Sequence, residues 1–215
     1  MPIRTVPSVA VPARDEPEPV LEVSDPLPGE TREVAERILD AALVLVARWG
    51  VTKTSLADVA KAAGCSRATV YRAFPGGKAH LFQSLGLREL EAYRQAVADV
   101  VDAADDFDDA LTRALMVASR LLHDHEAAQF IVEHEPELLL PFLGFNQVDV
   151  LYRAAAESLA PHLERFVAPD RAAWAAEWCA RLFITFVFNP APDTDLARVD
   201  DARDLVTRFV SPAFR

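Results

Sequence analysis

The sequence predicts an all-α fold, in which an N-terminal three-helix domain is followed by a larger helical domain. Apolar residues recur at steps of three and four from Thr31 almost to the end of the chain, as one buried face of a helix requires. No sustained alternation of apolar and polar residues, the pattern of a half-buried strand, is present. Glycine and proline fall mainly between the periodic segments, where they end helices.

Residues 1–30 are predicted to form a disordered, acidic, proline-rich tail. They contain seven of the fifteen prolines and carry six acids against two arginines. Proline interrupts helices, and the segment offers little apolar surface for burial. We therefore expect the folded part of the chain to begin at Thr31.

The first helix is predicted from Thr31 to Trp49. Its apolar stripe consists of Val34, Ile38, Ala42, Leu45 and Trp49. Gly50 follows directly, and glycine often takes the left-handed conformation that ends a helix.

Two short helices are predicted next, over about 55–63 and 67–74, with Gly64 between them. Thr54 or Ser55 can cap the first and Ser66 the second, because a hydroxyl accepts a hydrogen bond from a free backbone N–H. Pro75-Gly76-Gly77 then forces a turn.

Past this turn the apolar spacing predicts six more helices. We expect them at about 78–104, 107–123, 126–135, 140–166, 171–188 and 196–210. Pro136, Pro169 and Pro190 lie between helices, whereas Pro161 falls within one and should kink or end it.

The two short helices and their glycine turn match the plan of a helix-turn-helix, whose second helix reads DNA in the major groove. A recognition helix needs small or hydrogen-bonding side chains near its N-terminus to reach base edges, and hydroxyls or cations around it for phosphates. Ser66, Arg67, Ala68 and Thr69 meet the first need, and Tyr71, Arg72 and Lys78 meet the second.

The distribution of charge agrees with this interpretation, although the total charge does not. A net charge of −11 over 215 residues argues against a polyanionic partner. Residues 31–82, however, carry eight basic and four acidic side chains, a net +4. All three lysines of the chain, Lys53, Lys61 and Lys78, lie in this segment. The cations are concentrated where phosphates would be met.

The segment from Val51 to Phe82, VTKTSLADVAKAAGCSRATVYRAFPGGKAHLF, resembles the DNA-binding region of the TetR (tetracycline-repressor) family of bacterial transcriptional regulators. It contains a threonine-rich cap, a V-A-x-x-A-G run, S-x-x-T-V-Y, a phenylalanine, and a basic residue before an apolar pair. It departs from the family pattern in having three residues between Phe74 and Lys78 and an alanine at position 73. Without the resemblance, the alternative is a plain helical hairpin.

The resemblance implies a role for each matching residue. Thr54 and Lys78 would contact phosphates at helix N-termini. Arg67, Ala68 and Thr69 would form the base-reading end of the recognition helix. Ser66 would cap that helix and could contact a phosphate, Tyr71 would bind a phosphate, and Arg72 could do either.

By the same resemblance, residues 31–82 form the DNA-binding domain and residues 83–215 a helical effector-binding and dimerisation domain. The last two long helices would then pair with those of a second copy. Two apolar stripes are compatible with this pairing, although burial within one chain produces such stripes as readily. They consist of Trp174, Trp178, Leu182 and Phe186, and of Val199, Ala202, Val206 and Phe209.

Aromatic residues of the C-terminal region are candidates for a ligand pocket, although each of them could equally belong to the core. They are Phe107, Phe130, Phe142, Phe145 and Tyr152. His123, His125 and His134 lie among acids but lack metal-ligand spacing, so we predict a polar helix end rather than a metal site.

No motif for catalysis or for a cofactor occurs, so the chain is not predicted to be an enzyme. Cys65 and Cys179 give neither a disulfide framework nor a zinc pair, and no apolar run is long enough for a signal peptide or a membrane span. These features predict a cytoplasmic protein with no membrane partner.

The sequence therefore predicts a homodimeric repressor that binds a pseudo-palindromic double-stranded DNA operator and leaves it when a small-molecule effector binds. One alternative is a helical small-molecule-binding protein whose DNA-binding face is vestigial. Another is a regulator without a ligand, or an activator, with the same DNA chemistry.

Overall fold

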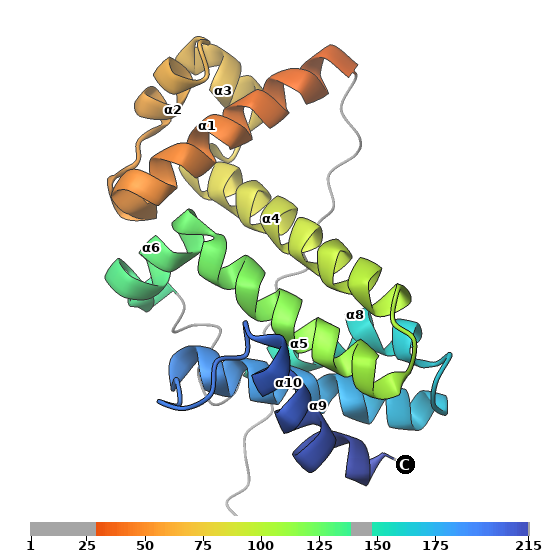
Figure 1. The fold of residues 1–215 in the computed structure, drawn as a ribbon. Helices are drawn as coiled ribbons and strands as arrows, with labels where there is room; N and C mark the ends of the chain where they lie inside the picture. Colours follow the sequence, from red (N-terminus) through yellow and green to blue (C-terminus); the bar gives the residue numbers. More distant parts are fainter. Residues whose placement is uncertain (1–28, 139–147, 215) are drawn as a thin grey trace, which may run out of the picture.

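The computed structural model describes residues 29–138 and 148–214, which form a bundle of helices (Figure 1). No β-strand occurs among these residues. The predicted all-α class is therefore confirmed. None of the helices within the described ranges is long and apolar enough to cross a membrane.

Helix α1 spans Gly29–Lys53 and is interrupted at Gly50. Gly50 has a φ of +78° and a ψ of 173°, so it differs from the predicted left-handed helical conformation and lies in a region that essentially only glycine adopts. Ile38 and Ala42 are fully buried along its inner face, whereas Trp49 at its end is 46% exposed. The apolar spacing thus predicted the buried face correctly but extended it one turn too far.

Helices α2 (Leu56–Ala62) and α3 (Arg67–Ala73) follow, and local hydrogen bonds set where each begins. The Ser55 hydroxyl accepts a bond from the backbone of Asp58, whose carboxylate accepts one from the Ser55 backbone in return. The Ser66 hydroxyl caps α3 by accepting the backbone N–H of Thr69. Gly64 has a φ of +64° between them, so the predicted turn is present.

Helix α4 spans Gly77–Asp102 and joins two hydrophobic cores (Figure 1). Leu81 and Leu85, near its start, belong to an N-terminal core formed with α1, α2 and α3. Ala98 and Val101, near its end, are buried against the helices that follow. The boundary predicted after residue 82 falls within this continuous helix.

Eight further elements complete the described chain. They are α5 (Phe107–Asp124), α6 (Glu126–His134), the 3₁₀ turn η1 (Pro136–Leu138), α8 (Val148–Leu163), α9 (Pro169–Phe188), α10 (Val199–Leu205) and its continuations η2 (Val206–Val210) and η3 (Ser211–Ala213). α8 ends two residues after Pro161, earlier than the predicted residue 166. Proline offers no N–H to the carbonyl four residues before it, which weakens the last turn of the helix. The start predicted at residue 140 lies outside the described residues.

Helix α6 packs beside α1 rather than within the C-terminal core (Figure 1). Ala127 is buried in the N-terminal core, and Ile131 packs against that core. The C-terminal core is formed by α5, α8, α9, α10 and the end of α4. Helices α4 and α6 are therefore the two elements that connect the halves of the molecule.

Candidate nucleic-acid interface and its connection to the C-terminal core

The outward face of α3 gathers most of the predicted DNA-contact residues. Val70 is fully buried and Phe74 is 4% exposed, and they hold α3 against α1 and α2. Their burial turns the opposite side of the helix to solvent. Ser66, Arg67, Ala68, Tyr71 and Arg72 are exposed there, and Thr69 is half-buried.

Hydrogen bonds order the first turn of this face. The backbone N–H of Thr69 donates to Ser66 Oγ over 3.1 Å, and the two hydroxyls lie 2.9 Å apart. Arg72 reaches back toward Thr69 Oγ1 at 3.5 Å. The cap thus holds the hydroxyls at the end of α3 where base edges would be approached.

The structure buries Thr54, which the resemblance implied as a phosphate contact. Its side chain is 0% exposed, and its hydroxyl donates to the Gly50 carbonyl over 2.6 Å. That bond satisfies a carbonyl at the interruption of α1. The side chain has no surface to offer a phosphate in this conformation, whereas the capping residue beside it, Ser55, is exposed.

Lys78 lies at the start of α4 and ties that helix to the end of α1. Its Nζ donates to the Thr52 carbonyl over 2.9 Å and lies 5.7 Å from the ring centroid of Phe82. An ammonium group has three donors, so this bond still leaves capacity for another acceptor.

Glu135, at the C-terminal end of α6, binds the backbone just after Gly50. Its carboxylate accepts the N–H groups of Val51 and Thr52 over 2.7 and 2.9 Å. Burial opposes ionisation of Glu135, but hydrogen bonds from Thr52 and Val51 and the nearby Lys78 charge outweigh it, so its pKa lies below the ordinary value. A Cβ at Gly50 would lie 2.6 Å from this carboxylate. Glu135, Gly50, Val51 and Thr52 form what we call the α6 clamp.

Sequence reasoning missed the α6 clamp. Glu135 appeared only as one acid among the histidines of a polar helix end, and it lies 84 residues from Val51 in the chain. The sequence feature that came closest was Gly50. Its place after an apolar stripe predicted a positive φ, but it did not predict that the Glu135 carboxylate leaves no room for a side chain there.

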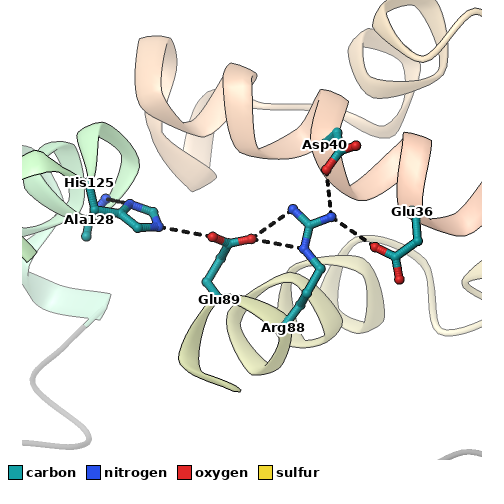
Figure 2. A network of polar contacts seen from close by, with 6 residues as sticks. All are labelled: Glu36, Asp40, Arg88, Glu89, His125 and Ala128. Atoms are coloured by element: carbon teal, nitrogen blue, oxygen red, sulfur yellow. Dashed lines mark hydrogen bonds and ion pairs between the residues drawn. The ribbon is translucent and has the colours of Figure 1, made fainter. Parts of the chain in front are cut away.

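A second polar network joins α1, α4 and α6 (Figure 2). Arg88 donates to Asp40 of α1 over 2.7 Å and to Glu36 over 3.2 Å, and it also pairs with Glu89 over 2.8 Å. The Glu89 carboxylate lies 3.2 Å from Nε2 of His125. Nδ1 of His125 accepts the backbone N–H of Ala128 and so caps the start of α6. His125 is thus a capping residue.

Helices α4, α5, α8 and α9 line an apolar cavity of about 250 Å³ that is partly open to solvent. None of the predicted pocket aromatics that the structure describes lines it. Phe107 lines a different hollow with Phe214, Phe130 stacks on His134, and Tyr152 lies under Arg181. Phe142 and Phe145 lie outside the described residues. The cavity is lined mainly by small and aliphatic side chains. A search of the sequence for aromatic residues could not have located it.

The apolar stripes predicted on the last helices divide between core and surface. Ala202 and Val206 are fully buried, and Leu182 and Phe186 pack against the C-terminal core. The remaining large members, together with Phe188, stay exposed. Their exposed fractions are 65% for Trp174, 49% for Trp178, 47% for Phe188, 39% for Val199 and 74% for Phe209.

Comparison with known proteins gives consistent matches. The family model described as bacterial regulatory proteins of the tetR family matches residues 38–85. An uncharacterized HTH-type transcriptional regulator of Mycobacterium tuberculosis is 29% identical over 194 residues, which cover 85% of this chain and 86% of the relative. The HTH-type transcriptional regulator AcrR of Shigella flexneri is 40% identical over 73 residues, covering 31% of this chain and 34% of its own.

Solved structures share the fold. The TetR family repressor AlkX from a Dietzia strain, implicated in biodegradation of n-alkanes, is 23% identical with a TM-score of 0.60, covering 83% of this chain and 95% of its own. The fatty acid degradation regulator FadR from Bacillus halodurans is 18% identical with a TM-score of 0.56, covering 80% of this chain and 93% of its own.

Proposed function

Because the chain belongs to the TetR family of bacterial regulatory proteins, we propose that it is a homodimeric repressor that a small-molecule effector releases from its operator. Transcriptional regulation is the activity of the family and of the relatives that match. What we propose beyond family membership is that the protein represses, forms a homodimer and responds to an effector.

The exposed face of α3 carries the DNA-binding part of the proposal. Arg67, Ala68 and Thr69 read base edges in the major groove, where a guanidinium can bind a guanine through two hydrogen bonds. Ser66 and Tyr71 bind phosphates, and Arg72 serves either purpose.

Lys78 completes the proposed phosphate contacts from the start of α4. Its bond to the Thr52 carbonyl holds it at the end of α1, a few residues before α2. The Thr54 side chain is left out of the proposed contact set because it is fully buried.

The exposed apolar side chains of α9, α10 and η2 support a homodimer. Trp174, Trp178 and Phe209 are large side chains that a second copy would cover. A two-fold dimer presents two α3 helices to one face of DNA, with half-sites about one helical turn apart, so the operator should be pseudo-palindromic.

Helix α4 supports the link between effector and DNA. It forms one wall of the apolar cavity and also carries Lys78 and Arg88. A ligand that fits the cavity better when α4 is displaced shifts the protein toward a state with altered spacing of the two α3 helices, and so releases the operator.

Selection of bound sites from random double-stranded oligonucleotides tests the DNA-binding proposal directly. We expect an enriched, two-fold symmetric site and submicromolar binding at physiological salt. Absence of binding even at low salt, where phosphate contacts are strongest, would exclude a DNA-binding role. A reporter driven from the selected site then separates repression from activation.

A further inference from the structure

The cavity between α4, α5, α8 and α9 has few polar groups, and the structure already pairs them. The Tyr93 hydroxyl donates to the Ala118 carbonyl over 3.2 Å. Arg94 donates from Nε to the Ser158 hydroxyl over 2.8 Å and from Nη1 to Glu91 over 3.3 Å. A ligand would have to break these bonds to gain a polar partner from them.

Ionised groups are kept out of the cavity interior. Arg94 is the one charged residue among the described residues that line it, and its side chain is 49% exposed, which places its charge toward solvent. Cys179 lines the wall and is 3% exposed, and burial raises the pKa of its thiol to about 12, so it is neutral at physiological pH. A ligand whose charged group lay among these side chains, away from the open side of the cavity, would lose hydration without a matching partner.

The remaining surface is hydrocarbon. Leu115, Leu159 and Phe183 contribute large apolar surfaces, and alanines on α5, α8 and α9 leave the space between them open. An apolar cavity of about 150 Å³ accommodates benzene. By proportion, a cavity of about 250 Å³ accommodates on the order of ten non-hydrogen atoms.

We propose that this cavity binds an uncharged, largely hydrocarbon molecule of on the order of ten non-hydrogen atoms. That this molecule is the effector rests on the proposed function. The binding itself requires nothing of the DNA-binding helices.

Calorimetric titration of the full chain with three ten-carbon probes tests the ligand class. The probes are decan-1-ol, decanoate and decylammonium, which share a chain but differ in charge at neutral pH. We expect decan-1-ol to bind at least about tenfold more tightly than either ion, because each ion loses hydration in the cavity.

Two cavity-filling substitutions localise the binding. Ala155→Leu on α8 and Ala180→Leu on α9 occupy the space and should each weaken decan-1-ol binding about tenfold or more. Ala92→Leu is the matched control, since Ala92 is exposed on α4 and does not line the cavity. Circular dichroism melting confirms that each variant is folded.

The outcomes separate the two proposals. Equal or tighter binding of decanoate or decylammonium, no binding of decan-1-ol, or full affinity in both folded cavity variants would overturn the ligand class. Binding of decan-1-ol with the expected selectivity, but with no loss of a fluorescent operator duplex in an anisotropy titration, would uphold the ligand class. It would contradict this molecule's role in operator release.

Discussion

At Glu135, one carboxylate of α6 binds two backbone N–H groups of the helix that begins the N-terminal core. We expect Glu135→Gln to lower the free energy of unfolding by about 2 kcal/mol, because a carboxamide loses the charge and can turn only one oxygen toward the two donors. Urea denaturation measures this. Glu137→Gln, two residues away and exposed, is the control and should change stability by less than about 0.5 kcal/mol.

The pH dependence of that difference follows from the lowered pKa of Glu135. A carboxyl whose pKa is lower in the folded state stabilises fully above its unfolded pKa of about 4.3, and the contribution is lost as pH falls through the folded pKa. The stability gap between wild type and Glu135→Gln should therefore be constant from pH 6 to 8 and shrink below about pH 4. A gap unchanged at low pH would refute a role for the ionised carboxylate.

Gly50 and Gly64 differ in the space that surrounds them. Both have positive φ, but a Cβ at Gly64 meets nothing within 4 Å, whereas a Cβ at Gly50 lies 2.6 Å from the Glu135 carboxylate. Gly64→Ala should cost about 1 kcal/mol of unfolding free energy and Gly50→Ala about 2 kcal/mol more than that. In a Glu135→Ala background the difference between the two substitutions should fall; if it persists, the carboxylate is not what excludes the side chain.

Arg67 and Tyr71 differ in their proposed roles on α3. Arg67→Ala should reduce the preference for the operator over random DNA by about 1–3 kcal/mol. Tyr71→Phe should weaken all DNA similarly, because a lost phosphate contact carries no base information. Anisotropy titrations with operator and scrambled duplexes measure both, and Arg153→Ala, at an exposed position of α8, is the control. The reverse pattern would exchange the two roles.

At the scale of elements, the exposed apolar side chains of α9 and η2 lead to a prediction about assembly. Phe209→Glu places a charge where the side chain is now 74% exposed, so the fold of one chain should be unaffected. The dissociation constant of the proposed dimer should rise about thirtyfold or more, because the interface would bury that charge. Analytical ultracentrifugation measures it. An unchanged dimer would place the interface elsewhere.

Elements with local signals could be predicted closely, and those without could not. The start of α3 depends on Ser66 and the break at Gly64 on its missing side chain, both visible in the sequence. The end of α8 was predicted three residues too late, because the apolar pattern continues past Pro161. α6 was predicted as a helix, but its place beside α1 depends on Ala127 and Ile131 packing on a distant core, which periodicity does not specify.

Across the whole molecule, charge is divided between the DNA-binding segment and the rest. Residues 31–82 carry +4, whereas residues 1–30 carry −4 and residues 83–215 carry −11. Deleting residues 2–28 should raise affinity for non-specific DNA severalfold at low salt, because their net negative charge repels phosphates. Replacing the acids of this segment with their amides provides a length-matched control and should have the same effect. No change in either variant would remove any role for the segment in discrimination.

The sequence by itself determined the helical class, the Ser66 cap of α3, the outward face of α3 and the concentration of lysines in residues 31–82. These features depend on residues within a few positions of one another, so their physical causes are present in any short segment. Tertiary structure alone decided the α6 clamp, the burial of Thr54 and the apolar cavity. The clamp joins residues 84 positions apart, and a cavity is defined by the side chains that fail to fill the space between packed helices. Neither is encoded by spacing along one chain segment.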